Sequence, residues 1–301
     1  MAGGSTGHII QSLVVNLAIA AAKGVGAVIT GSGAMLAETI HSAADCGNQL
    51  LLLLGVRQAA RPSDATHPLG YGRALYFWSF MVALLLFSGG GVFSIYEGIH
   101  KIQHPEPVDN VWLAIGILLF SLALEGYATF SNIKEANTRR GNKPFFRYLR
   151  DTKDSDFVVV MGENSAASLG LSFALAALLM AYFTGDARWD AIGSLVIGVI
   201  LIGVAVFLAN EVKSLLVGEA ADPEIAEAAR AVIQAHPKVG TVLNLITVQQ
   251  GPGEVLVALK VKPQPDLRAD ELCQAINDFE AALQAKRPEI RWCFIEPDLT
   301  D

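Results

Sequence analysis

The stretch WDAIGSLVIGVILIGVAVFLAN, residues 189–210, has one charged side chain near its start and is otherwise dominated by aliphatic residues and glycine. A helix of roughly 20 apolar residues spans the hydrocarbon core of a bilayer, which is about 30 Å thick. The stretch therefore predicts a membrane-spanning helix. The whole chain agrees, because 52% of its 301 residues are hydrophobic and its mean hydropathy is +0.42.

Five further runs have the same character, and together they predict an integral membrane bundle of six transmembrane helices. A soluble core could explain one or two such runs, but not six in succession. The runs cover residues 9–29, 34–57, 74–99, 111–132, 157–183 and 189–210. The turn Thr30-Gly31-Ser32-Gly33 predicts a tight hairpin between the first two spans. The run Gly89-Gly90-Gly91 would allow close helix contact or a bend in the third.

Basic residues in the short loops predict which helix ends face the cytosol. The loop after span 4 carries seven Lys and Arg residues within 134–153, whereas the loops after spans 3 and 5 are poor in them. Both termini are therefore expected to be cytosolic. The first residues resemble neither a signal peptide nor a transit peptide, which favours a bacterial inner membrane. The basic loop itself is expected to touch anionic lipid, with shaping of the cytosolic entrance as the alternative.

The composition changes after about residue 218, where the sequence predicts a small cytosolic α+β domain with the order αββαβ. The expected helices cover 222–235 and 268–286, and the expected strands cover 242–248, 255–261 and 290–295. We therefore divide the chain into a transmembrane transport domain, residues 1–215, and a cytosolic domain, residues 216–301. A domain of only about 80 residues has a modest core, which dimerisation would support.

Several function classes are disfavoured. The net charge of −7 does not suggest nucleic-acid binding, and the three cysteines form no C-x-x-C pair. The sequence contains no nucleophile motif, phosphate loop or HExxH helix, so an enzyme is not expected.

Polar residues inside the spans are the strongest functional signal, because an ionised side chain at mid-membrane costs roughly 2.5–3.5 kcal/mol. Span 2 concentrates such residues within an arc of roughly 100°. They are Glu38, His41, Asp45, Asn48 and Gln49. His41 and Asp45 lie one helical turn apart, so that both side chains could ligate one metal ion. Glu38 lies nearer the outer end of the span, where a solvated role is at least as compatible with the sequence.

Three other spans also carry polar residues. Span 5 has Glu163 and Asn164, span 4 has Glu125, and span 1 has Asn16 and Lys23. Glu125 could be an auxiliary site residue, or it could pair with Lys23 and serve packing. Asn16 fits a structural role better than that of a ligand.

The chain resembles the cation diffusion facilitator family. The resemblance lies in AETIHSAADCGNQ at 37–49, DATHPLGYGR at 64–73 and GDARWDAIGS at 185–194, and it extends over nearly the whole chain. It implies a six-helix transport unit, a homodimer, and a metal site between spans 2 and 5. It also implies exchange of metal for protons and a ferredoxin-like cytosolic domain.

Span 5 departs from the commonest family pattern, His-x-x-x-Asp or Asp-x-x-x-Asp. Here Val160 cannot ligate, Asn164 stands where the Asp would be, and Glu163 precedes it. The pattern is more similar to a subgroup with Glu-Asp in span 5, which includes mitochondrial zinc transporter-like members. Glu163 and Asn164 point about 100° apart on a helix, so they are not expected to face His41 together. The charged Glu163 is the preferred ligand.

Two other sites known in the family are incomplete here. The loop keeps Asp64 and His67, which could be auxiliary ligands or could order the loop. In the tail, the matching strands carry Asn244 and Ala258, and the last strand carries Cys293 and Glu296. A regulatory metal site in the tail is therefore not expected.

These residues predict a secondary transporter that exports a divalent metal cation, without a prosthetic group. Zinc suits the mixed imidazole and carboxylate ligands, and iron, cobalt, manganese and nickel remain open. Metal and protons would compete for the same deprotonated groups, which predicts proton antiport. The alternatives are a divalent cation channel and a membrane metal sensor without proton coupling.

Overall fold

The computed structural model describes residues 2–105, 108–153 and 155–300, and its contacts divide the chain into two compact units. The first unit contains Met1–Arg57, Phe77–Arg150 and Ser155–Val212. The second contains Gln58–Tyr76, Asp151–Asp154 and Lys213–Asp301. The second unit thus combines the C-terminal part of the chain with the two connections between helices at Gln58–Tyr76 and Asp151–Asp154.

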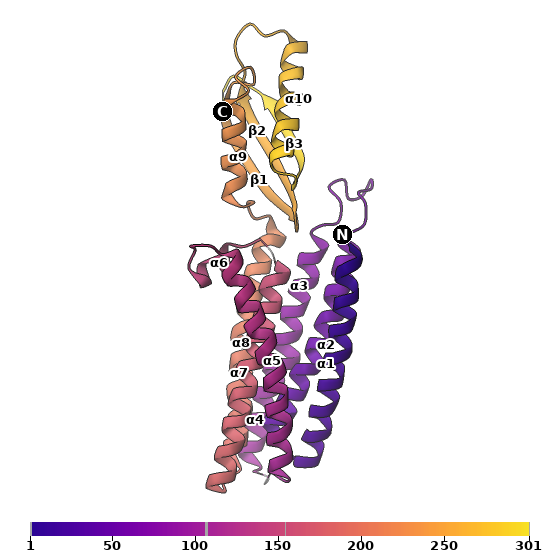
Figure 1. Ribbon diagram of the computed structural model, residues 1–301, viewed down its shortest axis with the longest axis vertical. Coiled ribbons are helices and arrows are strands. Elements are labelled where there is room, and N and C mark those ends of the chain that lie inside the picture. The colour runs from indigo at the N-terminus through magenta and orange to yellow at the C-terminus, as the bar shows by residue number, and fades with distance from the viewer. Residues whose placement is uncertain (1, 106–107, 154, 301) are drawn as a thin grey trace. The chain divides into compact units, whose positions relative to one another are not determined.

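The first unit consists mainly of long helices that run side by side (Figure 1). All six apolar runs of the sequence are helical, as predicted. The elements are α1 (Ala2–Thr30), α2 (Gly33–Ala59), α3 (Ala74–Leu85), the π-helical η1 (Leu86–Val92), α4 (Phe93–Gln103), α5 (Val111–Arg139), α6 (Phe145–Asp151), α7 (Ser155–Thr184) and α8 (Arg188–Val217).

Within the described residues, four helical stretches are long and apolar enough to cross a membrane. They are Ala74–Gln103, Val111–Arg139, Phe157–Thr184 and Arg188–Val217. The apolar stretch Asn16–Thr30 is shorter. Helix α2 is not among the four, and it is the helix that carries His41, Asp45 and Asn48. The apolar helices form a helical transmembrane domain.

The glycine run in the third predicted span lets two helices approach closely. A Cβ atom added at Gly91 would lie 2.5 Å from Ile202 Cγ1 and 3.2 Å from the Ile202 backbone nitrogen. On the opposite side of the contact, a Cβ atom at Gly198 would lie 2.9 Å from the Gly91 carbonyl oxygen. Small residues therefore bring η1 against α8, which confirms the predicted close contact.

The hairpin between α1 and α2 is as tight as predicted, and a residue far along the chain fixes it. Gly31 adopts φ +64° between the two helices, a conformation that favours glycine. The Asp190 carboxylate accepts hydrogen bonds from Ser32 Oγ (2.6 Å), the Gly33 amide (2.6 Å) and the Ala34 amide (3.4 Å). Asp190, near the start of α8, thus pairs amides at the amino end of α2 that lack helical acceptors.

The second unit contains a three-stranded sheet, with the elements in the predicted order αββαβ. They are α9 (Pro223–Gln234), β1 (Thr241–Gly251), β2 (Glu254–Lys262), α10 (Ala269–Lys286) and β3 (Ile290–Pro297). Strand β2 lies in the centre, antiparallel to β1 and parallel to β3.

Both helices of the sheet region contribute to one core. The alternate β2 residues Val255, Val257, Leu259 and Val261 are buried in it, together with residues of α9 and α10 that include Ile225 and Phe279. The predicted helix start at Asp222 is confirmed, because its Oδ1 accepts a hydrogen bond from the Glu224 amide at 3.0 Å. The helices cover one face of the sheet and leave the other face open.

Candidate metal-binding site

The centre of α2 holds polar atoms that are buried without a hydrogen-bond partner among the described residues. His41 is fully buried, and its Nε2 lies 3.7 Å from Asp45 Oδ2. Among the described residues, neither ring nitrogen of His41 has a hydrogen-bond partner, and neither does Asp45 Oδ1. Leaving a buried polar atom unpaired costs about 1–3 kcal/mol. These atoms are suited to a partner that is not part of the chain, such as a metal ion or water.

Helix α7 lies along this polar face of α2. Asn48 Nδ2 donates a hydrogen bond to Glu163 Oε1 at 2.5 Å, and Glu163 is buried. Farther along both helices, a Cβ atom at Gly170 would lie 2.5 Å from Glu38 Oε1. Since 38 pairs with 170 and 48 with 163, the two helices run antiparallel. His41 and Asp45 lie between the two contacts.

The structure brings the expected ligands together as pairs rather than as one cluster. Within the described residues, no group of three or more His, Cys, Asp and Glu side chains is placed to hold a metal ion. Glu163 faces α2, where Asn48 holds it. The Asn164 backbone oxygen accepts a hydrogen bond from Thr129 Oγ1 of α5 at 2.8 Å. No described hydrogen bond links the Asn164 side chain to α2.

Lys23 of α1 forms a buried network beside this site. Its Nζ lies 3.3 Å from Glu38 Oε2 and 2.8 Å from Ser42 Oγ, and Lys23 and Glu38 are both fully buried. The sequence left open a solvated role for Glu38 and a pairing of Glu125 with Lys23. The structure instead buries Glu38 fully and places Lys23 on Glu38. The missed signal was the spacing of four residues between Glu38 and Ser42, which places both on one face of α2.

The two auxiliary candidates, Glu125 on α5 and Asn16 on α1, are both partly buried. Glu125 is partly buried on α5, and no described hydrogen bond or ion pair connects it to Lys23 or to α2. Asn16 is partly buried on α1, and no described hydrogen bond connects it to α2 or α7.

The loop residues Asp64 and His67 make their described contacts within their own loop. Asp64 accepts hydrogen bonds from the amides of Thr66 (2.9 Å) and His67 (2.8 Å), from Thr66 Oγ1 (2.7 Å) and from Tyr71 OH (2.7 Å). The Tyr71 hydroxyl, with the other donors, holds the pKa of Asp64 well below its usual range. The His67 ring stacks on Tyr71 at 4.1 Å between centroids.

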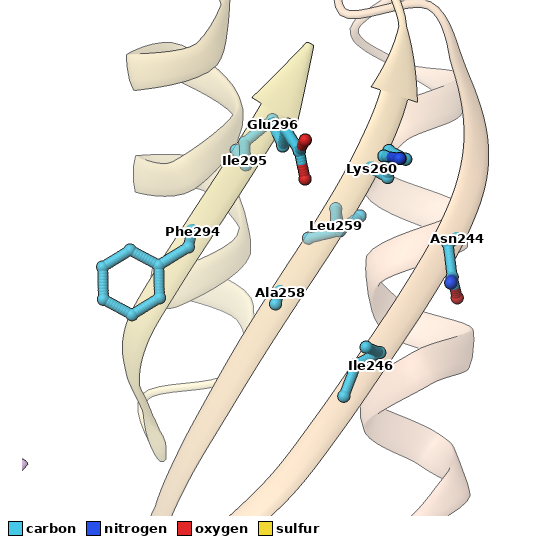
Figure 2. Close-up of a pocket in the computed structure, with 8 residues that line it drawn as sticks. All are labelled: Asn244, Ile246, Ala258, Leu259, Lys260, Phe294, Ile295 and Glu296. Carbon is cyan, nitrogen blue, oxygen red and sulfur yellow. The ribbon is translucent and has the colours of Figure 1, made fainter. Parts of the chain in front are cut away.

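The tail residues that the sequence singled out lie on two faces of the sheet. Figure 2 shows Asn244, Ala258 and Glu296 on the open face of the sheet, beside Ile246, Lys260 and Phe294. Cys293 packs instead against the core on the helix side. Burial, together with Glu280, raises the pKa of the Cys293 thiol to about 12. Since a thiol binds metal as the thiolate, Cys293 is poorly suited to ligation.

The region that carries these features matches the model of a known protein family. A family model described as the cation efflux transmembrane domain matches residues 9–217, which contain α2, α7 and the pairs described above. The chain belongs to the cation efflux family. Family membership confirms the resemblance to cation diffusion facilitators, which rested on the second span and the loop after it.

Similar proteins include two zinc antiporters and a cation-efflux pump. The chain is 32% identical over 230 residues to the mitochondrial proton-coupled zinc antiporter SLC30A9 of Xenopus laevis, covering 76% of this chain and 41% of the relative. The human protein of the same name is 29% identical over 271 residues (87% and 47%). The cation-efflux pump FieF of Serratia proteamaculans is 26% identical over 223 residues (74% and 69%). The chain thus spans less than half the length of these antiporters.

Proposed function

We propose that this protein exports a divalent metal cation, zinc in the first place, in exchange for protons. The observation that carries the proposal is the pair His41 and Asp45 on α2, whose ring nitrogens and Oδ1 are buried without a hydrogen-bond partner among the described residues. Glu163 of α7 is hydrogen-bonded to Asn48, one to two turns farther along α2. The zinc antiporters among the relatives support zinc as the substrate and protons as the counter-ion.

Metal binding would give the unpaired atoms of His41 and Asp45 a partner and would replace the hydrogen bond between Glu163 and Asn48. The His41 nitrogens and Asp45 Oδ1 lack partners in the described structure, so they offer nitrogen and oxygen ligands that zinc accepts. Glu163 would leave Asn48 to complete the site, with Asn164 or water as a further ligand. Protons and metal compete for the imidazole and the carboxylates, because each group ligates only when deprotonated. Alternating access to the two sides would then couple metal export to proton entry.

The surrounding architecture forms part of the same proposal. We take α1 and α2 as spans in addition to the four apolar stretches, which gives six spans in a transport domain of residues 1–215. Residues 216–301 form a cytosolic, ferredoxin-like domain, and two copies of the chain form a homodimer. Both termini face the cytosol, and the membrane is the inner membrane of a bacterium, in keeping with a bacterial cation-efflux pump among the relatives.

Uptake into proteoliposomes tests the mechanism. Vesicles that contain a pH-sensitive dye and the full chain should take up zinc when a proton gradient is imposed, and zinc alone should change the internal pH. Asp45→Asn should lower uptake at least about tenfold, which corresponds to about 1.4 kcal/mol. The matched control Asp109→Asn changes an exposed carboxylate of the same unit and should leave uptake unchanged.

The same assay distinguishes the competing functions. Wild-type uptake rates in a correctly folded Asp45→Asn variant would refute the site. Zinc flux that ignores the proton gradient and leaves the internal pH constant would indicate a channel. Competition between zinc, iron, cobalt, manganese and nickel in this assay identifies the physiological class of metal.

A further inference from the structure

Helix α6 (Phe145–Asp151) interrupts the loop that connects two membrane-spanning stretches. The stretch Val111–Arg139 precedes it and the stretch Phe157–Thr184 follows it, and both are long and apolar enough to cross a bilayer. Figure 1 places α6 at the ends of α5 and α7. A short helix between two such ends must lie near the membrane surface.

One side of α6 is fixed to the bundle by a small apolar core. Leu149 is buried against Ala136 of α5 and Met161 of α7, and Phe145 and Tyr148 pack against the same cluster. The preceding turn is also ordered, because Arg140 donates hydrogen bonds to Asn137 Oδ1 and to the Lys143 carbonyl oxygen, both at 2.7 Å. The packed side decides which residues of α6 point outward.

The outward side combines a large aromatic ring with cations. Phe146 is 84% exposed, and Arg150, one turn farther on, is exposed, as is Lys143 before the helix. Segment 134–153 carries seven basic residues against the two acids Glu135 and Asp151.

Several of these basic residues already have partners. Arg139 pairs with Glu135 at 2.5 Å, and Lys153 pairs with Glu219 at 2.6 Å. Among the ion pairs of the described residues, none involves Lys143 or Arg150. The exposed side of α6 therefore presents a hydrophobic ring flanked by unneutralised positive charge.

We propose that α6 is an interfacial anchor that binds anionic phospholipid headgroups, with Phe146 inserted among the acyl chains and Lys143 and Arg150 on the phosphates. A helix lying in the interface places aromatic residues at the acyl boundary and basic residues at the headgroups. Charge complementarity favours an anionic lipid over a zwitterionic one, and the neighbouring spans place that lipid within reach. The proposal is independent of the metal site.

The depth of Phe146 provides the first test. Phe146→Cys would be labelled with an environment-sensitive fluorophore in a Cys273→Ser background, since Cys273 is the exposed native cysteine. The label on the full chain in vesicles should be quenched by lipids brominated in their chains and shielded from aqueous iodide. Quenching by iodide in vesicles with and without phosphatidylglycerol would overturn the proposal. So would shielding from both quenchers, which would point to a protein covering α6.

The charge dependence provides the second test, and it does not depend on the labelled variant. The ratio of phosphatidylglycerol to phosphatidylcholine retained by the purified protein should fall in Lys143→Gln/Arg150→Gln. Each basic residue at an anionic surface contributes about fivefold, so that the expected fall is at least about tenfold. Arg230→Gln/Lys238→Gln removes the same charges from exposed positions of the second unit and should keep the wild-type ratio. Equal ratios in both double variants would refute lipid binding by α6.

Discussion

Lys23 Nζ of α1 lies 3.3 Å from Glu38 Oε2 of α2, and both side chains are fully removed from solvent. Lys23→Met would leave the Glu38 carboxylate buried without its cation, which costs about 3–5 kcal/mol in the free energy of unfolding. Chemical unfolding in detergent micelles measures this loss. The double variant Lys23→Met/Glu38→Met should recover most of it, because an apolar pair needs no charge partner. If the double variant is no more stable than Lys23→Met, the unpaired Glu38 carboxylate is not the cause of the lost stability.

The contact between Asn48 and Glu163 predicts which residue of span 5 ligates the metal. Glu163→Gln keeps a carbonyl oxygen for the 2.5 Å hydrogen bond from Asn48 but loses the charge. Zinc uptake should fall at least about tenfold, equivalent to about 1.4 kcal/mol, with little change in stability. Asn164→Ala should change uptake by less than about threefold. If Asn164→Ala lowers uptake as much as Glu163→Gln does, the assignment of Glu163 as the metal ligand of span 5 is wrong.

Asp190 joins the start of α8 to the amino end of α2. Asp190→Ala removes the acceptor of Ser32 Oγ, of two α2 amides and of the ion pair with Lys101 at 3.8 Å. Loss of a cap and of these buried partners should lower the free energy of unfolding by at least about 2 kcal/mol. The exposed Asp109→Ala should change it by less than about 0.5 kcal/mol. Equal effects in unfolding experiments would contradict this role of Asp190.

Gly91 should tolerate no side chain, whereas Gly203 of α8 should. A Cβ atom at Gly91 meets Ile202 at 2.5 Å and the Gly198 carbonyl oxygen at 3.3 Å, but one at Gly203 meets nothing within 4 Å. Gly91→Ala should therefore destabilise the protein by about 1–3 kcal/mol. Gly203→Ala should be neutral or stabilising by up to about 1 kcal/mol, because alanine favours the helix. Melting temperatures of the two variants in the same micelles test this prediction, and an equal change in both would contradict it.

The loop bonds of Asp64 predict an unusual tolerance of acid. Its pKa is lowered, so the stabilisation is present above the ordinary carboxyl pKa and is lost only as the pH falls through the lower folded value. Tyr71→Phe removes the largest cause of that shift, and the loop should then open at a higher pH. Cleavage of the loop 60–73 by an acid-active protease at stepwise lower pH measures the opening. Identical pH profiles for wild type and Tyr71→Phe would rule out this role of the hydroxyl.

The sequence by itself determined the helices, the order of the sheet region and the residues of the α2 polar face. These features follow from apolar run length, from strand alternation and from the helical period, which act over a few neighbouring residues. The spacing of His41 and Asp45 therefore predicted their proximity within one helix. The resemblance in span 2 and in the loop after it was enough to indicate the family.

Only the tertiary structure decided which residues of different helices meet. Lys23 could have reached Glu125 or Glu38, and the packing of α1 on α2 placed it on Glu38 and Ser42. The structure likewise paired Glu163 with Asn48, 115 positions away, and Asp190 with the amino end of α2. Such pairs depend on the relative height and rotation of packed helices. Those quantities are set by side-chain volumes along the whole contact, and no local pattern of the sequence encodes them.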